Sequence, residues 1–193
     1  MTSENSDNDT HVTAIILAGG RGRRAMGRDK GWLQWNEKPL VTQVYNVIST
    51  QVVQVIISCN RNVDRYRELA SNAVPDERGE FLGPLAGIES AGKLVKTAFT
   101  VVVPCDAPTL PNDLVDRLLK PFALREDLEV TYAWDGDRPQ VLLTAIRMSA
   151  LPTITVCLNE GGRSMRDWHD YVITQSVDFS DKSHCFANIN RLP

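Results

Sequence analysis

A glycine-rich and strongly basic loop follows the first apolar run of the chain. The run covers residues 13–17, and its β-branched side chains are typical of a buried strand. It leads into Gly19-Gly20-Arg21-Gly22, where the backbone can turn and approach a ligand closely. Backbone N–H groups beside dense positive charge suit a polyphosphate. The charges that follow are Arg21, Arg23, Arg24, Arg28 and Lys30, opposed only by Asp29.

Two other glycine loops fit this stretch poorly. A Walker loop ends in Gly-Lys-Ser/Thr, whereas Lys30 is followed by Gly31. Gly20-x-Gly22-x-x-Ala25 matches the loose dinucleotide pattern, but that pattern also needs an acid after the next strand to hold a ribose. The next apolar run ends in Ser58-Cys59-Asn60 and carries no acid there. A dinucleotide-dependent oxidoreductase is therefore disfavoured.

A single carboxylate, Asp106, ends the apolar run that begins at Phe99. A carboxylate at the mouth of a buried strand suits Mg²⁺, which takes one or two carboxylates together with waters and phosphate oxygens. A turn cap before Pro108 is an equally good interpretation from these residues alone. Lys30 would act as a point charge for phosphates, or else be a solvated surface lysine.

Short apolar runs alternate with amphipathic segments along the rest of the chain. This alternation predicts an α/β sheet with helices on both faces and a ligand site beyond the carboxyl ends of the strands. That site would gather the polar residues Gly19, Ser58, Asn60, Asp76 and Asp106. We expect strands at 13–17, 52–57, 99–103, 130–134, 141–146 and 173–177, and helices at 41–48, 64–70, 84–96, 111–120, 152–158 and 164–171.

Composition indicates an ordinary globular chain. Its 193 residues are 42% hydrophobic and 23% charged, with a net charge of −3, which argues against broad nucleic-acid binding. We predict a polar, disordered tail at 1–11 and a single domain at 12–193. No apolar run is long enough for a membrane span. The four cysteines are widely spaced and fit buried side chains in a reducing cytoplasm.

Several ordered blocks give the chain a family resemblance. It resembles the nucleotidyltransferases with an LAGG…DKG loop, and among them the molybdenum cofactor guanylyltransferases, from about Val12 onwards. The first and fourth blocks are the more specific. The blocks are Leu17-Ala18-Gly19-Gly20 with Asp29-Lys30-Gly31, Lys38-Pro39-Leu40, Gly83-Pro84-Leu85-Ala86-Gly87, Pro104-Cys105-Asp106-Ala107-Pro108, Asp135-Gly136 with Arg138-Pro139, and Val177-Asp178-Phe179 with Phe186-Ala187-Asn188-Ile189-Asn190.

The resemblance implies a fold and a reaction. The fold would be a Rossmann-like three-layer α/β/α sandwich of the nucleotide-diphospho-sugar transferase type, with a mostly parallel sheet. The reaction would transfer GMP from GTP to the phosphate of molybdopterin, release pyrophosphate and use Mg²⁺. Other cofactor-biosynthesis proteins or molybdoenzyme chaperones would be further partners. Two alternatives stay open: a cytidylyl- or sugar-phosphate nucleotidyltransferase, and a non-catalytic nucleotide-binding module.

The same resemblance assigns roles to individual residues. Lys30, Asp106 and Arg24 would be catalytic, and Asp106 would also hold the metal. GTP would contact Leu17, Ala18, Gly19, Gly20, Lys30, Ser58, Asn60, Asp76 and Asp106, with Asp76 at the guanine base or its ribose. The acceptor would contact Asp135, Arg138, Asn188 and Asn190. The flexible and basic segment at 160–166 adds Arg163 to this set, with solvated surface charge as the alternative interpretation.

Overall fold

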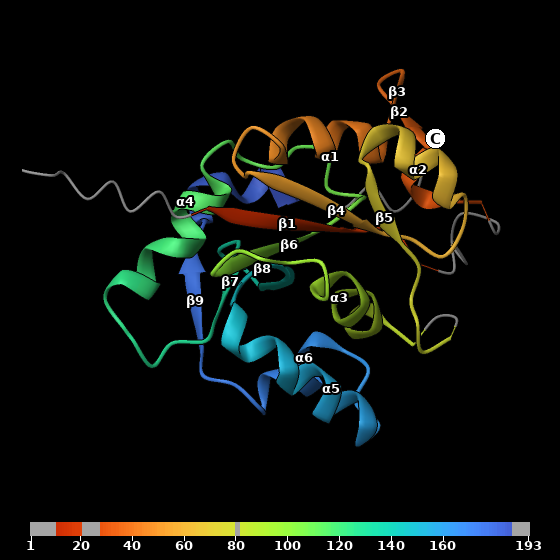
Figure 1. The fold of residues 1–193 in the computed structure, drawn as a ribbon. Helices are drawn as coiled ribbons and strands as arrows, with labels where there is room; N and C mark the ends of the chain where they lie inside the picture. Colours follow the sequence, from red (N-terminus) through yellow and green to blue (C-terminus); the bar gives the residue numbers. More distant parts are fainter. Residues whose placement is uncertain (1–10, 21–27, 80–81, 187–193) are drawn as a thin grey trace, which may run out of the picture.

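One seven-stranded sheet runs through the protein (Figure 1). The computed structural model describes residues 11–20, 28–79 and 82–186. The strand order is β5-β4-β1-β6-β8-β7-β9. These strands are β1 (Val12–Leu17), β4 (Gln54–Ser58), β5 (Asn72–Val74), β6 (Phe99–Pro104), β7 (Val130–Trp134), β8 (Pro139–Arg147) and β9 (Thr174–Asp178).

The sheet is mostly parallel, as the sequence predicts. Strands β5, β4, β1 and β6 pair in parallel, and so do β7 and β9. Strand β8 alone reverses, because it pairs antiparallel with both β6 and β7. The turn at 135–138 joins β7 to β8, so these two strands form an antiparallel hairpin.

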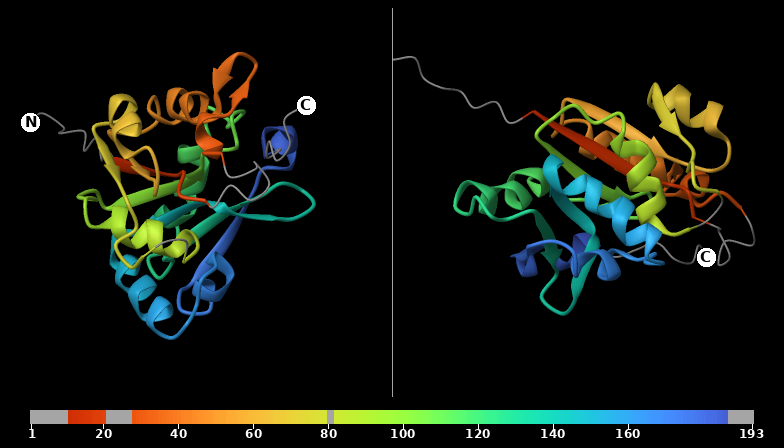
Figure 2. Two further views of the ribbon diagram at one scale, coloured as in Figure 1. Left: turned by 90° about the vertical axis from the view of Figure 1, so that its right-hand side faces the viewer. Right: turned by 60° about the horizontal axis from the view of Figure 1, so that its bottom comes forward.

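Helices cover both faces of the sheet and make a three-layer sandwich (Figures 1 and 2). On one face lie α1 (Leu40–Ile48), α2 (Val63–Leu69) and α4 (Leu114–Leu119). On the other lie α3 (Pro84–Gly92), α5 (Leu151–Asn159) and α6 (Met165–His169). Short 3-10 turns are η2 (Lys30–Trp32), η3 (Lys120–Ala123), η4 (Met148–Ala150) and η5 (Ser180–Phe186).

The two cores follow from the alternation of side chains along each strand. In β1, Ala14 and Ile16 face the α1 side, whereas Ile15 faces the α3 side. In β6, Val101 and Val102 divide in the same way. Because both faces of a central strand are buried, its sequence is a continuous apolar run. The apolar runs at 13–17 and 99–103 are therefore central strands.

A small hairpin lies outside the main sheet. Strands β2 (Gln34–Trp35) and β3 (Lys38–Pro39) pair antiparallel and project from the molecule beside α1, whose Gln43 amide donates to backbone carbonyls of both strands (Figure 2). Both turn residues, Asn36 and Glu37, have positive φ (48° and 62°), which is the backbone of a tight hairpin turn. This hairpin is not among the expected elements, because its strands are too short to produce a hydrophobic period.

Two predicted helix bounds are wrong. The helix expected at 84–96 ends at Gly92, because glycine favours helix termination and the next residues form tight turns. The helix expected at 111–120 begins only at Leu114. The side chain of Asp113 makes no capping hydrogen bond there and lies 3.9 Å from Arg117 instead.

The structure bears on membrane insertion but not on the predicted tail and domain division. Among the described residues, none of the helices has the length and apolar character that a membrane crossing requires. Of the predicted tail at 1–11, only His11 belongs to the described residues, so the tail and the single-domain division stay predictions.

The core on the α3 side makes a testable prediction about stability. Trp168 is fully buried, and its indole N–H donates to the Thr153 hydroxyl at 2.7 Å. We expect Trp168→Ala to lower the free energy of unfolding by about 3–5 kcal/mol, measured by urea denaturation, because it leaves a large cavity. Leu124→Ala is the control, since Leu124 is 82% exposed. Equal effects of the two substitutions would contradict this packing.

Candidate active site

The carboxyl ends of four parallel strands lie in one row. Leu17 of β1 is opposite Ser58 of β4 on one side and Pro104 of β6 on the other, and Ser58 is opposite Val74 of β5. The loops that follow these strands therefore leave the sheet at one edge. The chain order also reverses between β1 and β6, which is where ligands bind in open α/β sheets.

A cavity of about 420 Å³ lies at this edge, a size within the range of small-molecule sites. Eight of the nine residues predicted to contact GTP line it: Leu17, Ala18, Gly19, Gly20, Lys30, Ser58, Asp76 and Asp106. The structure thus brings together residues at or directly after the carboxyl ends of β1, β4, β5 and β6, and adds Lys30 of η2. Gly83, Pro84 and Gly87 add the start of α3 as a further wall.

Lys30 and Asp106 meet at the cavity although they are 76 positions apart in the sequence. The Lys30 ammonium donates a hydrogen bond to Oδ2 of Asp106. Both side chains are partly buried, with 26% and 13% of their surfaces exposed. A cation and a carboxylate held side by side can serve a phosphate and its counter-ion at one place.

Asp29 holds Lys30 in this position. Its carboxylate caps η2 by accepting from the Gly31 N–H at 3.2 Å. It also accepts from the Tyr66 hydroxyl at 2.6 Å and from the Asn62 amide at 2.9 Å. These bonds tie the residue before Lys30 to α2 on the same face of the sheet.

Tyr66 is a positioning residue that the sequence analysis missed. It is fully buried, and burial, followed by the hydrogen bond to Asp29, raises the pKa of its phenol far above the ordinary value. The phenol therefore stays protonated and donates to Asp29. Its oxygen also occupies the space that a Cβ on Gly31 would need. The glycine after Lys30 in the Asp-Lys-Gly motif was the available signal, because it marks a close approach.

Asp76 lies on the other side of the cavity in a polar cluster with Asn60. The Asn60 amide donates to Oδ2 of Asp76, and the Asp76 N–H donates to Oδ1 of Asn60, both at 2.8 Å. Ser58 donates to Oδ1 of Asp76 at 3.4 Å. Burial raises the pKa of the Asp76 carboxyl, and the bonds from Asn60 and Ser58 oppose that rise.

Asn60 does not line the cavity, unlike the other predicted GTP residues. Besides its paired bonds with Asp76, its amide donates to the Gly19 carbonyl at 3.4 Å. It thus links the Asp76 loop to the glycine segment after β1. The geometry gives Asn60 a positioning role for two cavity residues rather than a direct contact with the cavity.

The predicted acceptor residues are less close together. Burial raises the pKa of Asp135, but backbone N–H groups of Arg138 and Asp137 and the amide of Gln140 outweigh it and lower that pKa overall. Asp135 thus organises the β7–β8 turn. Arg138 is exposed, with its Nε 3.7 Å from Asp135. Neither residue lines the cavity.

Arg163 lies close to the cavity wall through its backbone. Gly83, which has a φ of +90°, packs so closely on the Arg163 carbonyl that a Cβ would clash. The Arg163 guanidinium donates to the carbonyls of Leu158 and Gly162, at 2.9 and 2.6 Å. Arg24, Asn188 and Asn190 lie outside the described residues.

The donor set at the cavity fits one magnesium ion bound with a substrate. Among the residues that the structure describes, no three His, Cys, Asp or Glu side chains converge as a metal cage. Asp106 is a carboxylate at the cavity wall beside the Lys30 ammonium. Mg²⁺ needs only one or two carboxylates when phosphate oxygens and waters complete its shell. Asp106 is thus the described residue best suited to hold it.

The cysteines near the cavity are poor nucleophiles. Cys105 lines the cavity wall, and burial raises its pKa well above the ordinary range. Burial also raises the pKa of Cys59 to about 12, with nearby carboxylates contributing. All four cysteines are buried free thiols. Because the thiolate is the reactive form, the cavity suits chemistry that needs no covalent enzyme intermediate.

Comparison with solved structures supports the fold. A molybdopterin-guanine dinucleotide biosynthesis protein A from Archaeoglobus fulgidus superposes with a TM-score of 0.74 at 22% identity, over 92% of each chain. A 4-diphosphocytidyl-2C-methyl-D-erythritol synthase from Anaerococcus prevotii gives 0.71 at 10% identity, over 94% of this chain and 91% of that one. The predicted nucleotidyltransferase sandwich is confirmed.

Sequence comparison identifies the family. The model of the MobA-like NTP transferase domain matches residues 14–173. The chain is 37% identical to a molybdenum cofactor guanylyltransferase of Shewanella loihica, covering 93% of this chain and 91% of that relative. It is also 37% identical to one of Vibrio atlanticus, covering 94% and 92%. This match and these identities show that the chain belongs to the MobA-like NTP transferase family.

Proposed function

We propose that this protein transfers GMP from GTP to the phosphate of molybdenum-loaded molybdopterin. The observation that carries the proposal is the meeting of Lys30 and Asp106 at one cavity, beside the glycine segment that follows β1. The names of the relatives supply the base and the acceptor, because both are called molybdenum cofactor guanylyltransferase. The product would be a guanine dinucleotide form of the cofactor.

The transfer needs no nucleophile from the protein. An oxygen of the acceptor phosphate attacks the α-phosphorus of GTP, and the bond from that phosphorus to the bridging oxygen of the β-phosphate breaks. Pyrophosphate leaves with the electron pair of that bond. The protein therefore contributes positioning and charge neutralisation.

The cavity residues divide this work. Backbone N–H groups of Gly19 and Gly20 and the Lys30 ammonium would contact the phosphates. Asp106 would hold Mg²⁺, which when bound neutralises phosphate charge. Ionised Asp76 would accept hydrogen bonds from the N1–H and 2-amino groups of guanine. Leu17, Ala18 and Ser58 would line the nucleotide, with Asn60 holding Asp76.

The acceptor side remains a proposal from the family pattern. Asp135, Arg138 and Arg163 would contact the pterin or its phosphate. Arg24, Asn188 and Asn190, outside the described residues, would complete the two substrate contacts. Buried free thiols fit a reducing compartment, so we place the reaction in the cytoplasm. Molybdoenzyme chaperones or other cofactor-biosynthesis proteins would deliver or take the cofactor.

Pyrophosphate release tests the proposed function. Purified protein, Mg²⁺ and molybdenum-loaded molybdopterin are mixed with GTP, CTP, ATP or UTP in turn. We expect release with GTP that depends on the pterin, because an ionised Asp76 in the cavity would accept hydrogen bonds from the N1–H and 2-amino groups of guanine. Release with CTP would overturn the base assignment, and no release from folded protein with any nucleotide would overturn the function.

Substitution of Asp106 tests the proposed metal ligand. We expect Asp106→Ala to reduce kcat by at least about 10²–10³-fold, because a preorganised group that neutralises transition-state charge is lost. GTP affinity is measured separately by calorimetry, so that chemistry and binding are distinguished. Asp116→Ala is the control, since Asp116 is exposed on α4. Near-normal turnover by the Asp106 variant would rule out the assignment.

The pH dependence of base selection tests Asp76. Burial raises its pKa above the ordinary value, so the carboxylate needed for guanine is lost at a higher pH than for an exposed aspartate. We expect the preference for GTP over ATP to fall on acidification through that raised pKa. Comparing the two nucleotides at each pH cancels protonation of their phosphates. Asp76→Asn should remove the pH dependence; a preference unchanged by this substitution would exclude Asp76 as the base contact.

A further inference from the structure

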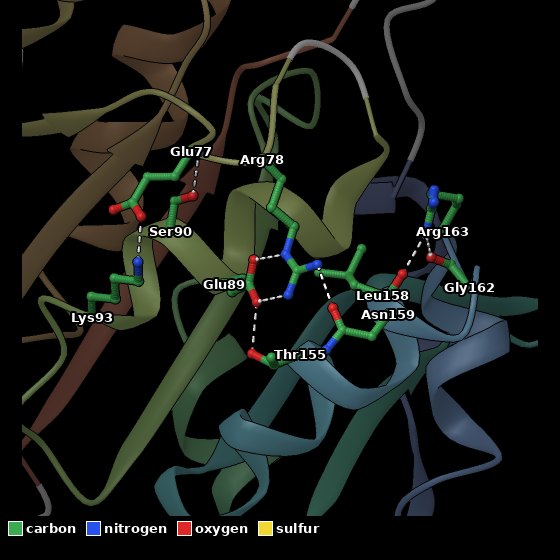
Figure 3. Close-up of polar contacts among 10 residues, drawn as sticks. All are labelled: Glu77, Arg78, Glu89, Ser90, Lys93, Thr155, Leu158, Asn159, Gly162 and Arg163. Carbon is green, nitrogen blue, oxygen red and sulfur yellow. Dashed lines mark hydrogen bonds and ion pairs between the residues drawn. The ribbon is translucent and has the colours of Figure 1, made fainter.

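Arg78 joins three segments of the protein that lie far apart in the sequence (Figure 3). It follows Asp76 by two residues. Its Nε and one terminal nitrogen donate to the two carboxylate oxygens of Glu89 on α3, at 2.5 and 2.8 Å. Its other terminal nitrogen donates to the Asn159 side-chain oxygen, at the end of α5, at 2.6 Å. All three polar nitrogens of this guanidinium are thus engaged.

Glu89 lies on α3, whose first turn forms part of the cavity wall. It follows Gly87, a cavity residue of α3, by two positions. The Thr155 hydroxyl of α5 donates to the same carboxylate at 2.6 Å. Only 14% of the Glu89 side chain is exposed, and the hydrogen bond from Arg78 lowers its pKa against the effect of burial. The pair is therefore a bidentate and partly desolvated link, which is the strong form of such an interaction.

Asn159 leads directly into the segment at 160–163, which includes the predicted acceptor residue Arg163. The Arg163 guanidinium bonds to carbonyls of Leu158 and Gly162, so this segment folds back on the end of α5 (Figure 3). Its carbonyl in turn contacts Gly83, which lines the cavity. Arg78 is therefore connected to both the Asp76 loop and the Arg163 segment.

We propose that Arg78 is a positioning residue that holds the base-binding loop and the acceptor-binding segment at a fixed spacing across the cavity. The inference rests on the proposed function of that site. Arg78 does not itself line the cavity. Its action passes through Glu89 to α3 and through Asn159 to the start of the Arg163 segment. Loss of this link would misalign the two substrates, which is costly for in-line transfer.

A neighbouring ion pair provides a matched control. Lys93 pairs with Glu77, so it also joins α3 to the loop after Asp76 (Figure 3). The Lys93 and Glu77 side chains are about equally exposed, at 57% and 58%, and their ion pair joins α3 to this loop without involving α5. Exposed pairs of this kind contribute little to stability. Lys93→Met thus removes a comparable cation without breaking the link to Asn159.

Steady-state kinetics with GTP and molybdenum-loaded molybdopterin test the proposal. We expect Arg78→Met to lower kcat by about ten- to hundredfold and to reduce the preference for GTP over ATP, because both sides of the cavity lose their spacing. Arg78→Lys should recover only part of kcat, since an ammonium cannot make the bidentate contact. Lys93→Met should match the wild type. Equal kinetics for Arg78→Met and Lys93→Met would overturn the proposal.

Substitutions of Asn159 test the contact between Arg78 and the Arg163 segment separately from the contact between Arg78 and Glu89. We expect Asn159→Leu to raise the KM for molybdopterin several-fold while the KM for GTP stays near wild type, because the Glu89 contact is intact. Asn159→Asp keeps an oxygen for Arg78 and should restore the wild-type KM. This pair keeps the test decisive if Arg78→Met fails to fold. An unchanged acceptor KM in Asn159→Leu would overturn the link to the acceptor side.

The same assays distinguish the two proposals. A folded wild type that transfers no GMP to the pterin would reject the proposed function itself. An active wild type whose Arg78 and Asn159 variants behave like Lys93→Met would reject only the role of Arg78.

Discussion

The in-register parallel pairing of β1 with β4 and β6 is the constraint on which the candidate active site depends. It places Leu17, Ser58 and Pro104 in one row, so the loops after them leave the sheet together. The backbone hydrogen bonds of this pairing are buried between two apolar layers, where a one-residue shift of register would exchange the side chains that fill the two cores. The same bonds that stabilise the sheet therefore set the spacing of the site.

Support for the site differs between its two sides. On the phosphate side, Asp29 links Lys30 to the buried phenol of Tyr66 and so to the core of one face. On the proposed base side, Asp76 has reciprocal hydrogen bonds with Asn60, and the N–H of the next residue, Glu77, donates to Ser90 of α3 on the other face. Arg78, two residues after Asp76, connects the same loop to Asn159 at the end of α5. The cavity thus lies between two groups of polar residues that are anchored on opposite faces of the sheet and joined by the hydrogen bond from Asn60 to the Gly19 carbonyl.

This arrangement suits a reaction governed by charge and alignment. Lys30 supplies a cation and Asp106 a carboxylate, while the neighbouring thiols are kept protonated by burial. Belonging to the MobA-like NTP transferase family agrees with such chemistry, since nucleotidyl transfer asks the protein to hold two anionic substrates in line. The structural neighbour with a cytidylyl product in its name shares the fold at 10% identity. The fold alone therefore does not determine which base is bound, and we propose that local residues such as Asp76 do so.

The sequence by itself determined six strands of the main sheet, most helices and the carboxyl-edge location of the candidate site, whereas the short edge strand β5 was not among the expected strands. Continuous apolar runs and the residues directly after them, such as Asp106 after β6, carry that information locally. The hairpin at β2–β3, the early end of α3 and the roles of Tyr66, Arg78 and Glu89 came only from the tertiary structure. Each depends on contacts between distant segments, as when Arg78 reaches Asn159 across 81 positions of the chain. Such contacts leave no period or spacing in the sequence, because the folded backbone alone decides which polar side chains meet.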